Sequence, residues 1–384
     1  MSQSKIYNPP SILSLVKLFA RIASATLFRA LSYPFRSTRA PSLRKDVLNT
    51  AIRTLLTHIT VPQSRYLNAS TTQRYLSFCK AQKRRPTTIE VPYSNGKEKA
   101  VAHWIGDPDA DVVILYFHGG AYFQPATSGT FLYLQHTITT LQKEKKGRSV
   151  AALVMAYTLA PEAAFPTQMQ EGAAVLRWLF DEKGRSAASV FLGGDSAGGC
   201  IALSLLSHLL HPRQDVEKVV LPGTLGGALL FSPSVAQRGN FDSFRRNAGV
   251  DMLPAVRIPD WGAMYLGKME ELQGSVETVF STDAYSEPVI AGEDWWLGLH
   301  QIVQNLLVMS GGDEVFADAI SALGEDVKSG WLKGGGEKDR VVFVETPREA
   351  HIGPIVDFMM TRGKGVVSNS QRIVEEWWRA RLSE

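Results

Sequence analysis

The chain has 384 residues, of which 45% are hydrophobic, so it is long and apolar enough to bury a large core. Its net charge of +4 comes from residues 1–45, which hold eight Lys or Arg and no acid and leave 33 basic against 37 acidic residues elsewhere. This balance argues against charge-driven nucleic-acid binding by the body of the chain. The only two cysteines, Cys79 and Cys200, exclude a disulfide-rich scaffold and fit a reducing compartment.

Residues 1–45 form a basic amphipathic segment. Apolar residues from Ile12 to Leu31 surround a narrow polar stripe whose members recur every three or four positions, which predicts a helix. The stripe consists of Ser14, Lys17, Arg21 and Ser24, and the basic residues of the segment begin at Lys5. Lysine and arginine interrupt the apolar run, which weakens both a secretory signal and a membrane-spanning helix.

Three hypotheses remain for this segment. The preferred one is a helix that lies in a membrane surface, which predicts an intracellular protein able to associate with an internal membrane such as the endoplasmic reticulum. The second is a cap helix over the rest of the fold. The third is a mitochondrial-type targeting segment, since the segment is basic, contains serine and lacks acids.

The remainder of the chain predicts an α/β fold. Residues 46–87 are expected to form a helical cap, with helices around 46–60 and 70–83. Within 88–384, strand-like runs alternate with helical ones, which predicts a mostly parallel central sheet with helices on both faces. The expected helices cover 126–142, 167–183, 198–210, 315–328 and 368–382.

The segment from about 233 to 300 lacks this alternation and is predicted to be an insertion that adds to the cap. It contains Trp261, Trp295 and Trp296, which core packing explains adequately. The sequence has neither a spaced Cys/His cluster nor a glycine-rich nucleotide loop, so no metal and no cofactor is expected.

The first motif with chemical content follows a buried strand at 112–117 and reads His118-Gly119-Gly120-Ala121-Tyr122. Glycines at a strand end let consecutive backbone N–H groups point at one spot, where they can stabilise an oxyanion. Gly119 and Gly120 are therefore predicted as oxyanion donors. His118 is expected to fix the loop through hydrogen bonds rather than act as a base.

The second motif is Gly194-Asp195-Ser196-Ala197-Gly198, which lies between an apolar strand-like run and the helix at 198–210. A G-x-S-x-G in this context is a nucleophile elbow, where small residues must flank the serine because the turn is so sharp. Ser196 is the candidate nucleophile. The backbone N–H of Ala197 is the third predicted oxyanion donor.

An acid and a histidine follow in the order that such a site requires. Asp313 and Glu314 come just after a strand-like run at 305–309, and either could be the acid. His351 follows the last strand-like run, at 340–345, and is the only histidine downstream of both acids. We expect it to take the proton of Ser196 while the acid holds the imidazole in the required tautomer.

Over roughly residues 88–384, the chain resembles the hormone-sensitive-lipase-like branch of the α/β-hydrolases. The resemblance implies an α/β-hydrolase fold with a lid built from N-terminal helices. It also implies an acid that opens a D-x-L-x-D pattern, which Glu314 to Asp318 matches, so Glu314 is preferred over Asp313. Besides the two motifs above, the resemblance rests on Tyr157-Thr158-Leu159-Ala160-Pro161-Glu162, Phe165-Pro166, and Ser232-Pro233 followed by Ser243, Asn247 and Asp251.

The leading functional hypothesis is a serine hydrolase that cleaves a carboxylic ester, with a short acyl group on a hydrophobic alcohol as the expected substrate. The resemblance extends to fungal steryl-acetyl hydrolases and secondary-metabolite esterases, which implies a sterol ester or a secondary metabolite. A second hypothesis uses the same site for lactone opening, dehydration or cyclisation. A third is a small-molecule-binding module, which exists in this fold where the base is lost, and His351 argues against it.

Overall fold

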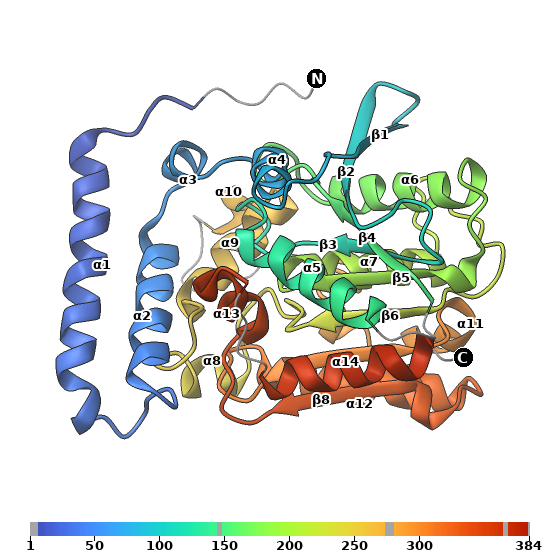
Figure 1. Cartoon of the computed structure of the whole chain (residues 1–384). Helices are drawn as coiled ribbons and strands as arrows, with labels where there is room; N and C mark the ends of the chain where they lie inside the picture. Colours follow the sequence, from blue (N-terminus) through green and yellow to red (C-terminus); the bar gives the residue numbers. More distant parts are fainter. Residues whose placement is uncertain (1–6, 144–147, 273–279, 364–367, 383–384) are drawn as a thin grey trace.

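The computed structural model describes residues 7–143, 148–272, 280–363 and 368–382, so Lys5 lies outside the described part. Its centre is an eight-stranded sheet with the order β1-β2-β4-β3-β5-β6-β7-β8 (Figure 1). Strand β2 is antiparallel to β1 and β4, and the other neighbours are parallel. The strands are β1 (Thr88–Tyr93), β2 (Glu98–Ile105), β3 (Val112–Phe117), β4 (Val150–Met155), β5 (Val190–Asp195), β6 (Gly227–Phe231), β7 (Leu306–Gly311) and β8 (Val341–Thr346).

The register of the parallel strands brings the motif-bearing loops to one edge of the sheet. Phe117 at the end of β3 pairs with Gly194 in β5, and Asp195 at the end of β5 pairs with Phe231 in β6. The ends of β7 and β8 are likewise level, with Gly311 opposite Thr346. Because parallel strands all end on the same side, the loops after β3, β5, β7 and β8 meet there.

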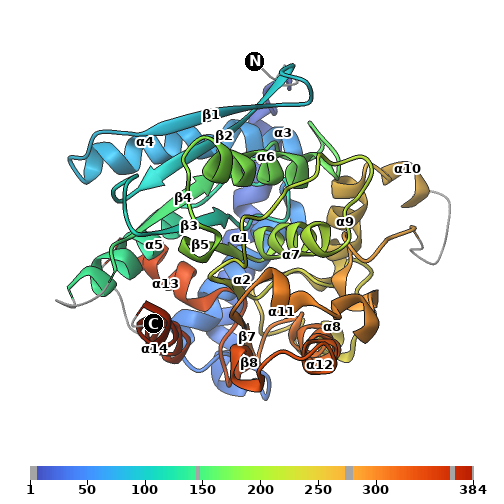
Figure 2. The ribbon, with the colours of Figure 1, turned by 90° about the vertical axis from the view of Figure 1, so that its right-hand side faces the viewer.

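Helices cover both faces of the sheet, as the alternation predicted (Figure 2). Every residue of β3 is buried; Leu115 and Phe117 face one layer of helices, while Ile114 and Tyr116 face the other. The first layer holds α6 (Thr167–Asp181), α7 (Ala197–Leu210) and α12 (Ala317–Lys333). The second holds α5 (Ser128–Gln142), α13 (Gly353–Thr361) and α14 (Asn369–Leu382).

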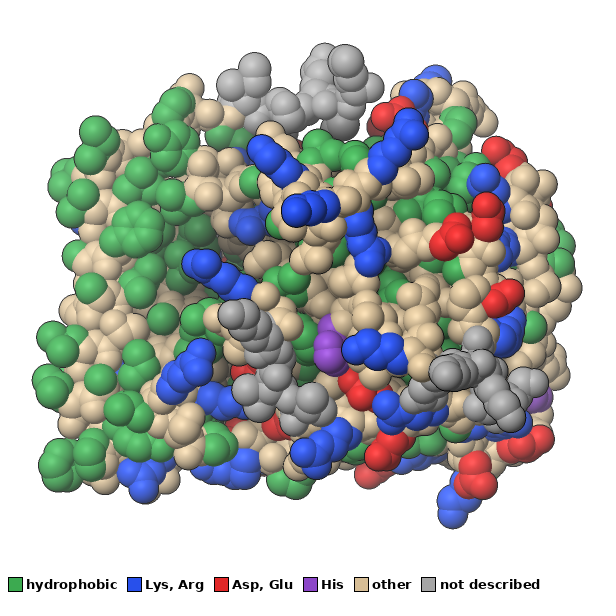
Figure 3. All heavy atoms as spheres, in the orientation of Figure 1, with side chains coloured by type: hydrophobic (Ala, Val, Ile, Leu, Met, Phe, Trp, Pro, Cys, Tyr) green, Lys and Arg blue, Asp and Glu red, His purple; other side chains and the backbone are tan. Residues whose placement is uncertain are grey.

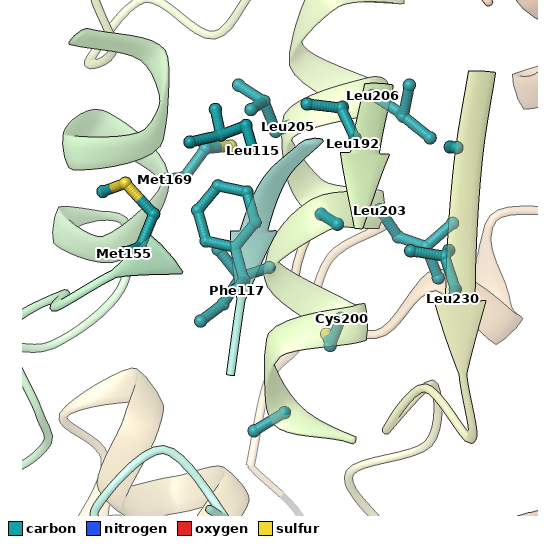
Figure 4. Close-up of a cluster of buried hydrophobic side chains, with 14 of the residues drawn as sticks. Leu115, Phe117, Met155, Met169, Leu192, Cys200, Leu203, Leu205, Leu206 and Leu230 are labelled. Carbon is teal, nitrogen blue, oxygen red and sulfur yellow. The ribbon is translucent and has the colours of Figure 1, made fainter. Parts of the chain in front are cut away.

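The core of the first layer fixes the helix that begins after Ser196. Figure 4 shows Leu192 of β5 and Leu230 of β6 packed against Leu203 and Leu206 of α7, with Phe117 of β3 beside them. Burying apolar side chains of this size contributes roughly 1.5–3 kcal/mol each. The N-terminus of α7 is therefore held rigidly at the edge where the loops meet.

Four helices precede the sheet and form an N-terminal cap: α1 (Ile12–Ser32), α2 (Leu43–His58), α3 (Val61–Leu67) and α4 (Thr71–Ala81). Helix α1 lies along the outer side of α2 (Figure 1). A buried ion pair joins them, with Arg29 Nη2 donating to Asp46 Oδ1 at 2.7 Å. The N-cap residues of α3 and α4 are Thr60 and Ser70, and their side chains form capping boxes.

The helix predictions are largely confirmed, but six of the fourteen described α-helices were not predicted, among them α3 and α13. The five expected helices within the catalytic domain correspond to α5, α6, α7, α12 and α14, with ends within a few residues. Helix α3 was missed because it has only seven residues and carries Pro62 near its start. Helix α13 was missed because its sequence directly follows the His351 loop, which was interpreted as loop alone.

The described residues of the segment from about 233 to 300 include several short helices, of which α8 (Asp242–Arg246), α9 (Ile258–Leu266) and α10 (Met269–Leu272) come first. Near its centre, a short turn of helix at Ala255–Arg257 contacts α2 of the cap. Its last part packs against α12 and α7 at the sheet, where Trp296 is fully buried. This region therefore contributes both to the cap side and to the core.

Candidate active site

Ser196 lies at the turn between β5 and α7, in the conformation of a nucleophile elbow. Its backbone has φ +53° and ψ −121°, a strained combination for a residue with a Cβ. Gly194 is required nearby, because a Cβ there would lie 2.5 Å from the carbonyl oxygen of Gly198. The N–H of Ser196 donates to the carbonyl of Phe231 at 2.8 Å, which anchors the turn to β6.

His118 holds the loop after β3 in place, as the sequence predicted. Its ring stacks on Tyr157 with 4.4 Å between centroids, and its Nδ1 lies 2.7 Å from the carbonyl oxygen of Gly119. Its Nε2 lies 3.1 Å from Oγ1 of Thr71 in α4, so the cap is joined directly to this loop. Burial lowers the pKa of His118 to about 4, which keeps the ring neutral at ordinary pH.

The residues after His118 form a strained turn beside Ser196. Gly120 has φ +132°, and Ala121 has φ +50°, a left-handed conformation uncommon for a residue with a Cβ. The carbonyl of Gly120 accepts the N–H groups of Phe123 and Gln124 at 3.1 and 2.8 Å, which fixes the turn. Gly120 and Ala121 both line the cavity that contains Ser196.

Gly119, predicted as an oxyanion donor, lines the same cavity as Gly120 and Ser196. Its backbone N–H interacts with the buried carboxylate of Asp195, which also accepts the hydroxyl of Tyr116 at 2.9 Å. Burial still raises the pKa of Asp195 to about 6. Ala121, which the sequence interpretation left without a role, follows Gly119 and Gly120 along the wall of this cavity.

The structure separates the two candidate acids. Oε2 of Glu314 lies 3.4 Å from Nδ1 of His351, and both side chains are buried. Asp313 is directed to Arg348 instead, with Oδ2 3.7 Å from Nη1, and its side chain is partly exposed. The geometry therefore favours Glu314 as the partner of the imidazole.

The charges around His351 favour its protonated form. Burial by itself would lower the pKa of His351, but the adjacent Glu314 carboxylate outweighs it and raises that pKa above its ordinary value of 6.5. Asp251 and Asp195 act in the same direction from further away. An imidazolium formed when His351 accepts a proton would be stabilised by these carboxylates.

Asp251 connects the loop of Glu314 to the loop of His351. One carboxylate oxygen accepts the N–H of His351 at 3.0 Å and that of Met252 at 2.7 Å, and the other accepts the N–H of Val315 at 2.9 Å. Burial raises the pKa of Asp251 to about 6. The sequence had only marked Asp251 by its spacing, without a role.

Two neighbours of Asp251 hold the Glu314 loop from the other side. Asn247 Nδ2 donates to the carbonyl oxygens of Gly312 and Glu314 at 3.0 and 2.8 Å, and the Ser243 hydroxyl donates to Val315 at 2.6 Å. The sequence had marked three residues by their spacing, Ser243, Asn247 and Asp251. In the structure their side chains support the backbone around Glu314.

The comparisons with known proteins agree with this geometry. A family model described as an alpha/beta hydrolase fold matches residues 114–351, which include both motifs and His351. The chain belongs to the hormone-sensitive-lipase-like branch of the α/β-hydrolase family. A crystal structure of an esterase from the bacterial hormone-sensitive lipase family superposes with a TM-score of 0.55 at 20% identity, over 97% of this chain and 99% of that chain, and supports the fold.

Two plant relatives are similar over most of their length. "Probable carboxylesterase 1" of Arabidopsis thaliana is 24% identical over 278 residues, covering 69% of this chain and 76% of its own. The gibberellin receptor GID1C of the same plant is 24% identical over 281 residues, covering 69% and 73%. The family therefore includes proteins named as enzymes and proteins named as receptors, and only the site can distinguish them.

In this α/β-hydrolase, Ser196 borders two cavities of very different size. The larger has a volume of about 260 Å³ and is also lined by His351. Its walls are mainly apolar side chains of α2, of the residue that follows α2, and of α13, namely Ile52, Leu55, Leu56, Ile59, Ile355, Val356 and Met359. The smaller has a volume of about 10 Å³ and is lined by Tyr122, Trp261 and Phe316, among others. Ala121 and Leu253 lie between the two cavities, because both line each of them.

Proposed function

We propose that the protein is a serine carboxylesterase that cleaves a short acyl group from a bulkier hydrophobic alcohol. Ser196 attacks the ester carbonyl, His351 takes the hydroxyl proton, and Glu314 orients the imidazole and stabilises its charged form. The observation that carries the proposal is the pairing of buried Glu314 and His351 at 3.4 Å beside a serine in elbow geometry.

The oxyanion of the tetrahedral intermediate is assigned to the backbone N–H groups of Gly120, Ala121 and Ala197. Ala197 is the first residue of α7, so the positive end of the helix dipole adds to its N–H. Gly120 and Ala121 line the cavity together with Ser196, in a turn that already has the strained conformation. Donors fixed in advance stabilise the developing charge without reorganisation.

The two cavities support the assignment of acyl and alcohol sides. His351 must return its proton to the leaving alcohol oxygen, so the alcohol has to lie on the side of His351. That side is the cavity of about 260 Å³, whose walls are mostly aliphatic. The acyl group is then directed to the cavity of about 10 Å³, which has room for little more than a methyl group.

The alternative is a receptor function, because one of the similar proteins is a gibberellin receptor. A binding protein has no need of a carboxylate that raises the pKa of a buried histidine next to a serine nucleophile, whereas an esterase does. The test is turnover of p-nitrophenyl acetate, propionate, butyrate and octanoate by the full chain. We expect acetate and propionate to have the highest kcat/KM, while binding of small esters without turnover would favour the receptor.

A further inference from the structure

The outer face of α1 is an exposed apolar surface. Seven large apolar side chains on this helix are more than half exposed: Ile12, Leu13, Val16, Phe19, Leu27, Phe28 and Leu31. In Figure 3 hydrophobic side chains gather along the left edge of the molecule, where α1 lies in Figure 1. Contiguous apolar surface of this extent on a soluble fold marks an interaction site.

The inner face of α1 is already in contact with the protein. Leu18 and Arg29 are buried and Ile22 packs on the core, at the three- and four-residue spacing of one helix face. The Arg29–Asp46 ion pair fixes that face on α2. The exposed side chains therefore lie on the side of a docked helix that points away from the body.

The charge next to the outer face is positive. Lys17 and Arg21 lie along one border of it and are exposed. In the described part of the first 45 residues, positions 7–45, the charged side chains are all basic. An apolar helix face bordered by Lys and Arg is the pattern of helices that lie in the surface of an anionic bilayer.

We propose that α1 docks the protein on the surface of an anionic lipid bilayer, with its apolar outer face in the headgroup region and Lys17 and Arg21 at the phosphate level. Within the described residues, no helix combines the length and the hydropathy that a membrane crossing requires. The helix therefore lies in the surface, parallel to it, and the proposal is independent of the ester chemistry at Ser196.

A second copy of this chain fits the same surface less well. Two copies paired antiparallel through this face would place the Lys17 and Arg21 borders side by side, where like charges repel, and a parallel pair would gain nothing from these charges. Binding to an anionic surface is instead strengthened by these charges, by roughly 1 kcal/mol for each Lys or Arg close to it, or about 30-fold for the two together.

The test is co-sedimentation of the full chain with vesicles of phosphatidylcholine containing phosphatidylglycerol, and with vesicles of phosphatidylcholine alone. Point variants are preferable to deletion, because removing α1 would leave Asp46 buried without Arg29. The test variant carries Val16→Ser, Phe19→Ser and Leu27→Ser. The matched control carries Val220→Ser and Leu332→Ser, two exposed apolar residues outside α1 and the cap.

We expect the wild-type chain and the control to bind anionic vesicles, and the triple variant to lose at least about tenfold in partitioning. The variant Lys17→Gln/Arg21→Gln should lose about 30-fold in partitioning on anionic vesicles only. Turnover of soluble p-nitrophenyl acetate and the melting temperature should stay unchanged in all variants, which confirms folding. Absent vesicle binding, equal binding by the triple variant, or a wild-type dimer that the triple variant dissociates would overturn the proposal.

Discussion

The carboxylate of Asp251 accepts the backbone N–H of His351 at 3.0 Å, and its second oxygen accepts that of Val315 at 2.9 Å. A single buried side chain thus sets the spacing between the loop that carries the imidazole and the loop that carries Glu314. Because Glu314 and His351 lie in loops that follow different strands, their alignment depends on a side chain that bonds to both loops.

Replacing Asp251 by Asn should lower kcat by about tenfold with little change in KM. The amide can keep one acceptor oxygen, but its NH2 group would face a backbone N–H and break one of the two loop contacts, at a cost of about 1–3 kcal/mol. The control is Asp318→Asn, since Asp318 accepts the N–H of Ser243 and pairs with Arg246. Equal losses of kcat in the two variants would show that Asp251 is only structural.

Glu314→Gln and Asp313→Asn should differ sharply in turnover. The glutamine would support the wrong imidazole tautomer, with an expected loss of up to about 10⁴-fold in kcat. Asp313 faces Arg348 near the surface, so Asp313→Asn should stay within a few-fold of wild type. Steady-state kinetics on p-nitrophenyl acetate decide, and an inactive Asp313→Asn with an active Glu314→Gln would reverse the assignment.

The pH dependence of kcat/KM should report the pKa of His351. Only the neutral imidazole can accept the serine proton, so the rate rises with pH as His351 deprotonates. Because that pKa is raised above 6.5 by Glu314, the inflection should lie on the alkaline side of this value. In Glu314→Gln the residual activity should inflect at lower pH, and an inflection that does not move would contradict the role of the carboxylate.

Trp261→Leu should relax the selectivity for short acyl groups. Trp261 closes the cavity of about 10 Å³, and its truncation would admit additional methylenes. One methylene in a fitted pocket is worth about 10-fold or more in kcat/KM, so the ratio of butyrate to acetate should rise by about that factor. Trp295→Leu is the control, because Trp295 bonds to Ser207 on the far part of α7. A ratio that changes equally in both variants would count against the acyl assignment.

Arg29→Met should destabilise the fold by about 3–5 kcal/mol, because it leaves Asp46 buried without its cation. Burial alone would raise the pKa of Asp46, but Arg29 and the N–H of Ala40 outweigh it and lower the pKa below 3.8. The ion pair therefore stabilises the fold above the pKa that Asp46 has in the unfolded chain. This stabilisation is lost as the pH falls through the pKa of Asp46 in the folded protein. In urea unfolding, the free energy of unfolding of Arg29→Met should lie far below that of the wild type at pH 7 and closer to it near pH 3. The control Lys17→Met should have the wild-type free energy of unfolding at both pH values.

The sequence predicts most of the fold because its signals are local. Strand β3 is apolar throughout and followed by glycines, and β5 is followed by the elbow motif, so both elements and their order can be recognised without a structure. The positions of Ser196 and His351 follow from that order. Helix α3, with seven residues, gives too short a pattern to be recognised.

The contacts between side chains within the site could not be predicted from the sequence. Asp313 and Glu314 are adjacent, and only the direction of the backbone after β7 decides which one meets His351. Asp251 lies 100 residues before His351, so its contact with that loop depends on tertiary packing and leaves no local pattern. The interaction of the Gly119 N–H with the Asp195 carboxylate likewise depends on a side-chain direction that a motif does not encode.

The measurement that tests the account most directly is covalent labelling of Ser196. The full chain is treated with a fluorophosphonate probe, and the modified peptide is identified by mass spectrometry while turnover of p-nitrophenyl acetate is followed. We predict a stoichiometric adduct on Ser196, loss of turnover in step with labelling, and a loss of about 10³-fold or more in Ser196→Ala with an unchanged melting temperature. A labelled protein that remains active, or Ser196→Ala with turnover near wild type, would contradict the central claim.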